Sequence, residues 1–205
     1  MGDWYQDIVI KDVSNEELEN VATQIFDYLI SEEIISSEMS DNVLGSDKGY
    51  CPGRSWQKAV EYPEESHFLE LWTNGLNIIK TRNVFYAIGD EFEAINCPNC
   101  NANNLECDWG ELFSKWIEDP DSAELECIKC KHSNSISEYL FKPSWALSNL
   151  GFKFWNWPIF KSSFIDELRI LTGKRIIMVE GKLQIKVPNN ANKIIAPSGM
   201  LRFIY

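Results

Sequence analysis

Two pairs of cysteines constrain this chain more tightly than any other feature of its sequence. The pairs are Cys97 with Cys100 and Cys127 with Cys130, and 26 residues lie between them. Two residues between cysteines let both sulfurs reach one metal ion at about 2.3 Å while the backbone turns around it. Each pair also follows a strand-like run, at residues 93–96 and 123–126. We therefore expect two hairpin tips to converge on one tetrahedral ion.

Residues 95–131 resemble the zinc-ribbon family of metal knuckles. The resemblance rests on Cys97-Pro98-Asn99-Cys100 and Cys127-Ile128-Lys129-Cys130. A closed four-thiolate site has no open position for water or substrate, so we expect structural Zn²⁺. Such an ion supplies on the order of 10 kcal/mol to a module too small to fold unaided. The chain departs from the family at Asn101, where ribbons often carry Gly, and we expect Asn101 to adopt the left-handed conformation. A predicted helix between the knuckles is a second departure, and it weakens any transfer of a ribbon's usual partners.

Three other uses of the four cysteines compete with zinc. Disulfides are disfavoured because the chain shows no export signal and the cytosol keeps thiols reduced. A thioredoxin-like redox centre would place one pair at the start of a helix in a βαβ unit, and neither pair lies there. Iron bound in rubredoxin style uses the same geometry, so the sequence leaves iron open.

The two remaining cysteines and the nearest histidine break the paired spacing. Cys107 is interpreted as a small buried hydrophobe and His132 as a surface residue beside the second knuckle. Cys51 is expected to pack within its loop. None of the three is therefore predicted to bind the metal.

Hydrophobic periodicity predicts an α+β fold with a mainly antiparallel sheet and two or three helices. Apolar residues at helical spacing favour a helix over 15–30, which begins at a Ser14–Glu17 capping box, and another over 109–117. A third helix follows Ser162/Ser163 and ends at Gly173. The predicted order along the chain is strand, helix, meander, cysteine module, strand, helix and hairpin. We expect a main domain formed by 1–94 and 135–205, with a zinc-ribbon-like module inserted at 95–134.

Two hairpins are expected within this sheet. Asn74-Gly75 lies between the β-rich runs 68–73 and 76–80, and Asn-Gly favours a tight type I′ turn. Residues 84–88 would add a third strand to that meander. The second hairpin would turn at Glu180-Gly181, between runs 175–179 and 183–187. Residues 36–66 are expected to be rich in loops.

Charge is distributed unevenly along this acidic chain, whose formal net charge is −12. Residues 1–90 carry −11, residues 91–138 carry −8 and residues 139–205 carry +7. An acidic protein repels nucleic-acid phosphates and attracts basic partners. No stretch has the length and apolarity of a membrane span, and the first residues lack the pattern of a signal peptide. We therefore expect a cytoplasmic protein, although a merely solubilising acidic surface explains the same charge.

These features favour a non-enzymatic, zinc-stabilised domain that binds a basic protein. An immunity protein of the bacterial type, which blocks a nuclease-type toxin, fits this physics because carboxylates imitate the phosphates that the toxin binds. The candidate contacts lie in the acidic stretch before the first expected hairpin. They are Glu61, Glu64, Glu65 and Glu70.

Two alternative functions remain open. A zinc-ribbon nucleic-acid protein would bind through the basic last third, where lysines accompany Trp145, Phe152, Phe154, Trp155 and Trp157. The same rings are also explained as core. An enzyme would need a carboxylate site that the sequence does not mark, because no nucleophile or dinucleotide motif occurs and only His67 and His132 are present. The run 49–55 resembles a phosphate-binding loop only superficially and is interpreted as a turn.

Overall fold

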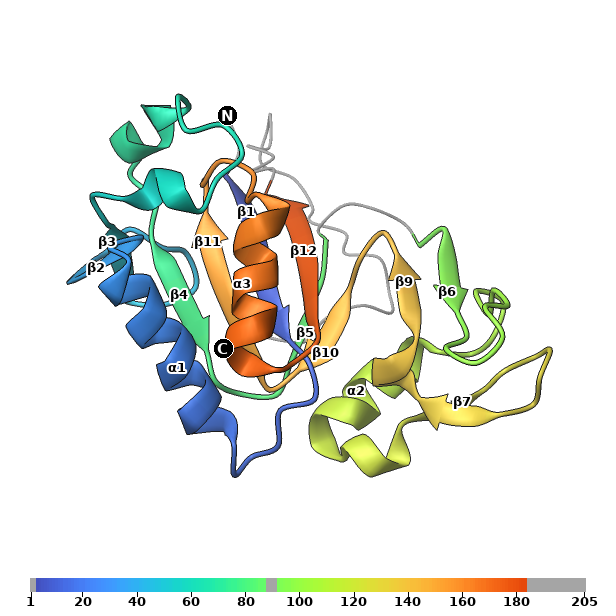
Figure 1. Ribbon diagram of the computed structural model, residues 1–205. Helices are drawn as coiled ribbons and strands as arrows, with labels where there is room; N and C mark the ends of the chain where they lie inside the picture. The colour runs from blue at the N-terminus through green and yellow to red at the C-terminus, as the bar shows by residue number, and fades with distance from the viewer. Residues whose placement is uncertain (1–2, 88–91, 184–205) are drawn as a thin grey trace, which may run out of the picture.

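The computed structural model describes residues 3–87 and 92–183. A six-stranded sheet forms its centre, with the strand order β12-β1-β11-β4-β3-β2 and antiparallel neighbours throughout (Figure 1). The strands are β1 (Trp4–Ile10), β2 (Ile35–Ser40), β3 (Gly49–Pro52), β4 (Leu76–Ile79), β11 (Leu150–Trp155) and β12 (Ile176–Lys182). The expected α+β class with a mainly antiparallel sheet is confirmed.

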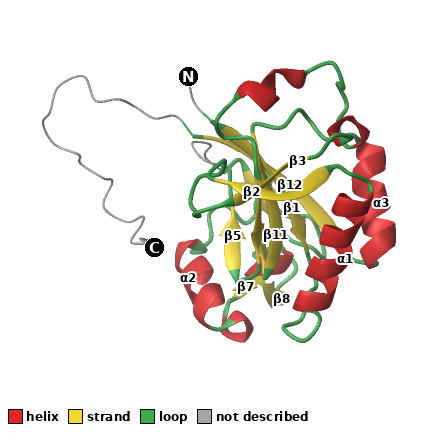
Figure 2. Ribbon diagram, turned by 90° about the vertical axis from the view of Figure 1, so that its left-hand side faces the viewer, coloured by secondary structure: helices red, strands yellow, loops and turns green. Residues whose placement is uncertain are grey.

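Two helices, α1 (Leu18–Ser31) and α3 (Ser162–Thr172), cover one face of this sheet (Figures 1 and 2). Alternation along the strands decides which residues meet the helices. Ile8 and Ile10 of β1 and Phe152 and Phe154 of β11 are fully buried in the core that the helices close. The buried helix residues in this core are Val21, Ala22, Ile25, Leu29, Phe164, Ile165 and Leu168.

Helix α1 begins later than predicted, at Leu18 in place of residue 15, whereas α3 ends at Gly173 as predicted. The Ser14 N–H donates to Glu17 Oε2 at 3.2 Å, and the Glu17 N–H donates to Ser14 Oγ at 3.3 Å, so the capping box forms. Regular helix begins only at Leu18. Gly173 ends α3 with φ at 65°, the left-handed value that glycine adopts without steric cost.

The opposite face of the sheet is covered by a small two-stranded sheet of β5 (Asn83–Phe85) and β10 (Ala146–Ser148). Phe85 and Ala146 pack there against Val9 and Val179. Gly151 allows this approach, because a Cβ at that position would lie 2.3 Å from the Phe85 ring. The close packing of β5 on β11 therefore requires a residue without a side chain.

An acidic group is buried on the same face. Asp7 is fully buried, and its Oδ2 lies 3.3 Å from Lys153 Nζ, which lies 3.8 Å from the centre of the Tyr5 ring. Apart from this ion pair, neither carboxylate oxygen has a hydrogen-bond partner among the described residues. Burial raises the pKa of Asp7 to about 6, against the opposing attraction of Lys153.

A second hydrophobic core lies beside the sheet, at the right of Figure 1. It contains α2 (Gly110–Glu118) and two short strand pairs, of which β6 (Ala94–Asn96) pairs with β9 (Leu140–Lys142). The other pair is β7 (Glu124–Glu126) with β8 (Ser133–Ser135). Val84 and Leu147, outside 95–134, also pack in this core. The division of the chain at residues 94 and 134 stays a prediction.

The second core is tied to the main sheet by cations that satisfy backbone carbonyls. Lys11 is buried, and its Nζ donates to the carbonyls of Ser137 and Leu147, each at 2.8 Å. Arg82 donates to the Ile117 carbonyl at 2.8 Å, at the carboxyl end of α2. These contacts hold the cysteine-bearing region against the sheet.

The first predicted hairpin is wrong in its strand pairing. Residues 66–70 form a short 3₁₀ helix, η2 (Ser66–Glu70), and β4 pairs with β3 and β11. Asn74 and Gly75 instead donate their N–H groups to the Asn42 carbonyl, so Asn-Gly serves a loop contact. The run expected from 84 to 88 pairs with β10 as β5, and residue 88 lies outside the described residues.

The second hairpin fails for a different reason. Glu180 and Gly181 continue β12, where they pair with Gln6 and Tyr5, so no turn occurs there. The expected return strand at 183–187 lies outside the described residues from 184 onward. Residues 36–66 also hold more structure than expected, because β2 and β3 form there beside η1 (Trp56–Lys58). The run 49–55 contains β3 where a turn was expected.

None of the helices in the described residues is both long and apolar enough to cross a membrane.

Candidate metal centre

The two cysteine knuckles have the same backbone construction. Cys97 directly follows β6 and Cys127 directly follows β7, as the sequence predicts. In the first knuckle the Cys97 carbonyl accepts from the Asn101 N–H at 2.9 Å, and the Cys97 N–H donates to the Ala102 carbonyl at 2.9 Å. The second knuckle has the same two bonds, each at 3.0 Å: the Lys131 N–H donates to the Cys127 carbonyl, and the Cys127 N–H donates to the His132 carbonyl. Each backbone loop thus turns around its own pair of sulfurs.

Each knuckle closes with a residue in the left-handed conformation. Asn101 has φ at 57°, which confirms the expectation for that residue, and Lys131 has φ at 61°. Asparagine reaches this region at low cost, whereas a lysine is uncommon there. The geometry of the second knuckle therefore holds although its sequence offers neither Gly nor Asn.

The four sulfurs lie close together in one compact cluster. Their Sγ atoms all lie within 4.8 Å of one another. Cys97 Sγ is 3.7 Å from Cys130 Sγ, and Cys100 Sγ is 3.6 Å from Cys127 Sγ. Metal–sulfur bonds of about 2.3 Å in a tetrahedron place neighbouring sulfurs about 3.8 Å apart. The donor set therefore fits one thiophilic ion such as zinc, and all four thiols are free of disulfides.

Backbone N–H groups also stabilise the thiolate form of these cysteines, which is the form that binds a cation. The N–H groups of Cys130 and Lys129 favour the Cys127 thiolate and lower its pKa to about 6. The His132 N–H favours the Cys130 thiolate, but burial and the neighbouring sulfurs outweigh it and raise the pKa of Cys130 to about 12. The first thiolate to form thus opposes ionisation of the next, a repulsion that a divalent cation relieves.

Asn104 joins the two knuckles, a role that no pattern in the sequence predicts. Its side chain is fully buried, and Nδ2 donates to the Ala102 carbonyl at 2.7 Å in the first knuckle. Its Oδ1 accepts from the Ile128 N–H at 2.9 Å in the second knuckle. One amide group therefore fixes the distance between the two halves of the site.

The other candidate ligands lie outside the cluster. Within the described residues, the only group of sulfur, imidazole and carboxylate ligands close enough to share an ion is the set of four cysteines. His132 is exposed, and its Nδ1 lies 3.2 Å from the Cys130 carbonyl. Cys107 is half-buried against the second core, and Cys51 lies in β3 near Ser40.

Comparison with known proteins found no relative of this chain. No protein-family model matches the chain, and neither a curated protein nor a solved structure matches it significantly. The function is therefore inferred from the residues of this chain alone.

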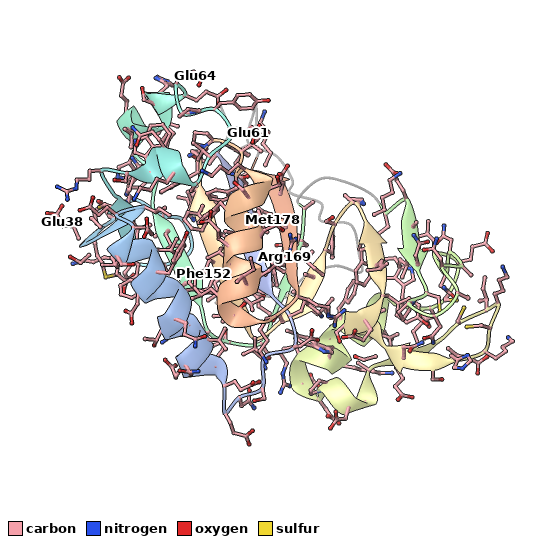
Figure 3. All side chains as sticks on the ribbon, in the orientation of Figure 1. Glu38, Glu61, Glu64, Phe152, Arg169 and Met178 are labelled. Atoms are coloured by element: carbon pink, nitrogen blue, oxygen red, sulfur yellow. The ribbon has the colours of Figure 1, made fainter. Side chains whose placement is uncertain are left out.

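The four predicted partner-binding glutamates are brought together on one surface segment. We call residues 59–73 the cap segment; it is drawn in teal at the top of Figure 1, and Figure 3 labels two of its glutamates. Glu61, Glu64, Glu65 and Glu70 are all exposed on it. His67 is exposed as well, with Nδ1 3.3 Å from Glu70 Oε2, an arrangement open to solvent on both side chains.

The basic last third of the chain is arranged differently from the cap segment. Phe152, Phe154, Trp155 and Trp157 are buried, which places these rings in the core. Trp145 is half-buried against the second core. The lysine and arginine that precede β12, Lys174 and Arg175, form ion pairs with Glu17, Asp12 and Glu138.

Proposed function

We propose that Cys97, Cys100, Cys127 and Cys130 bind one structural Zn²⁺. The observation that carries this proposal is the convergence of four sulfurs at tetrahedral spacing on two matched knuckles. Bound zinc would supply a cross-link between the knuckles, worth on the order of 10 kcal/mol. Other groups of the chain support this site: backbone N–H groups stabilise the thiolates, and Asn104 holds the two knuckles at a fixed spacing.

Elemental analysis of protein purified without added metal tests the zinc proposal. We expect one zinc ion per chain. Cobalt substituted for zinc should give the visible absorption of a tetrahedral thiolate site. Iron in place of zinc would overturn the choice of metal, and the absence of any stoichiometric metal would overturn the site.

We further propose that the protein is a non-enzymatic binding protein for a basic protein partner. Support comes from the net charge of −12 and from the four exposed glutamates of the cap segment. Complementary charge raises the association rate with a basic surface, and this gain falls as salt rises. The narrower form of the proposal is an immunity protein that neutralises a basic nuclease-type toxin by imitating nucleic-acid phosphates.

The narrow form is tested with a panel of catalytically inactive nuclease-type toxin domains. We expect one member to form a salt-sensitive complex with the purified protein, and its active form to be inhibited. If no member binds and none is inhibited, the immunity function is abandoned. Binding of a basic, non-nuclease protein would keep only the broader proposal.

The two alternative functions gain no support from a specific observation. Nucleic-acid binding would need free basic groups and exposed rings, whereas Lys174 and Arg175 are ion-paired and most of the rings are buried. A carboxylate enzyme would need a cavity with converging acids. Two surface hollows in the described part of the chain, lined by Phe26 and Tyr50 and by Arg169 and Ile176 among others, have no carboxylate in their walls.

A further inference from the structure

The cap segment is fixed to the body of the protein by its inward side. Phe68 is buried, and its ring centre lies 4.9 Å from that of Trp56 and 5.2 Å from that of Trp157. The Glu61 N–H donates to the Ile159 carbonyl at 2.7 Å. Asn74 Nδ2 donates to the carbonyls of Phe68 and Leu69. A segment fixed in this way presents its outward side chains at little entropic cost to a partner.

The cap segment carries large apolar side chains that the other described residues leave exposed. Trp72 is 65 % exposed, Tyr62 47 % and Leu69 43 %. Ile159, which is paired through its backbone with Glu61, is 47 % exposed. Tryptophan and tyrosine contribute most of the binding energy in many protein interfaces, and proteins seldom expose tryptophan to this extent without use.

The same segment carries negative charge that the described residues leave largely unpaired. Residues 59–73 contain four glutamates and neither lysine nor arginine. Glu61, Glu64 and Glu65 form no salt bridge with any of the described residues. The opposite arrangement holds at Lys174 and Arg175, where internal partners already neutralise the charge. A segment with both unpaired carboxylates and exposed rings is complementary to a surface that combines cations with an apolar hollow.

We propose that the cap segment is the docking surface of this protein, with Trp72 as its central anchor. The partner that fits is a positively charged protein surface with an apolar hollow that receives Trp72, while its lysines and arginines face Glu64 and Glu65. This inference rests on the proposed binding of a basic protein and assigns that binding to particular side chains. It adds Trp72, Tyr62 and Leu69 to a surface that the sequence marked only by charge.

Two synthetic peptides of equal positive charge provide the probe. One alternates arginine with leucine, and the other alternates arginine with serine. We expect the full-length protein to bind the arginine–leucine peptide more tightly at low salt, as measured by fluorescence anisotropy of the labelled peptide. Trp72→Ala should weaken that binding at least about tenfold, the loss typical of an interface anchor. The double variant Glu64→Gln/Glu65→Gln should weaken binding of both peptides and reduce its salt dependence.

A matched control is available on helix α3. Ile170 is 84 % exposed, so Ile170→Ala removes an exposed apolar side chain far along the chain from the cap segment. We expect it to leave the affinity unchanged. Circular dichroism and zinc content should be the same for all variants, and Leu69→Ala provides a second anchor variant if Trp72→Ala alters either.

The possible results separate this inference from the function on which it rests. If Trp72→Ala binds like the parent protein, or Ile170→Ala loses as much affinity, the docking surface is wrong while a basic partner remains supported. If neither basic peptide binds at low salt, the binding of a basic partner is itself overturned. Concentration-dependent self-association that Trp72→Ala abolishes would show that a second copy of this chain covers the cap segment, and would overturn the proposed partner.

Discussion

Asn104 Oδ1 accepts a hydrogen bond of 2.9 Å from the backbone N–H of Ile128, across the two halves of the cysteine site. Asn104 belongs to the loop after the first knuckle, and Ile128 lies inside the second knuckle between its two cysteines. The Asn104 side chain is fully buried, whereas Ile128 is half exposed, so the bond joins a buried amide to a partly buried backbone N–H. The sulfur cluster is therefore held by a neutral side chain as well as by the ion that we propose it binds.

Replacing Asn104 tests this bond directly. Asn104→Ala removes the bond to the Ile128 N–H and the bonds from Nδ2 to the carbonyls of Ile95 and Ala102, and the loss of such buried and partly buried bonds costs about 1–3 kcal/mol. We expect the free energy of unfolding of the zinc-loaded protein to fall by that amount in urea titrations, and zinc affinity to fall in competition with a chelator. Asn99→Ala is the control, because Asn99 is exposed and bonds only Asn134 at 3.3 Å. Equal losses from both variants would contradict the bridging role.

Substituting single cysteines distinguishes those that bind the metal from those that do not. Cys127→Ser should abolish stoichiometric metal binding, because three thiolates and a poorly ionised hydroxyl leave the tetrahedron incomplete. Cys107→Ser and Cys51→Ser should keep one metal ion per chain, since neither sulfur lies in the cluster. Elemental analysis of each purified variant gives the result. Loss of metal from Cys107→Ser would mean that the ligand set has been assigned incorrectly.

The buried Asp7 should make stability depend on pH. Its pKa is raised from 3.8 to about 6 in the folded protein, so the folded state holds the proton more tightly than the unfolded state does. Protonated Asp7 therefore contributes to the free energy of unfolding at low pH, and this contribution is lost as the pH rises from about 4 through 6. A shift of this size corresponds to about 3 kcal/mol.

Asp7→Asn removes this titration and so isolates it. The difference in unfolding free energy between Asp7→Asn and the parent should change in favour of the variant by about 2 kcal/mol between pH 4 and pH 7. Comparing the two proteins at each pH cancels the carboxylates whose pKa is lowered, such as Asp12 beside Arg175. A difference that stays constant over this range would show that Asp7 titrates normally.

The contact between Gly151 and Phe85 should appear as coupling between two substitutions. A Cβ at residue 151 would lie 2.3 Å from the Phe85 ring, so Gly151→Ala should destabilise the protein by about 1–3 kcal/mol. Phe85→Leu removes the ring edge and should restore part of that loss in the double variant. Thermal unfolding of all four proteins measures the coupling energy. Additive losses would show that the alanine is accommodated by movement elsewhere.

Much of the candidate site could be predicted from local sequence. Cysteines two residues apart restrict a short backbone turn, so Cys97, Cys100, Cys127 and Cys130 predicted two knuckles, and Asn101 predicted the left-handed residue that closes the first. Capping and periodicity placed the helices for the same reason, because the interactions that form them join residues three or four positions apart.

The remaining features depended on contacts between distant parts of the chain. Asn74-Gly75 has the local chemistry of a hairpin turn, yet the Asn42 carbonyl accepts both of its N–H groups, and β4 pairs with strands on either side of it. The role of Asn104 depends on Ile128, and the exposure of Trp72 depends on what the fold leaves uncovered.

The sequence by itself thus determined the ligand type, the knuckles, the helices and the α+β class, because each follows from residues a few positions apart or from overall composition. Only the tertiary structure decided which strands pair, which amide joins the knuckles and which aromatic rings face solvent. Strand pairing and burial are set by competition among many apolar faces for one shared core, and no local segment of the chain contains the outcome of that competition.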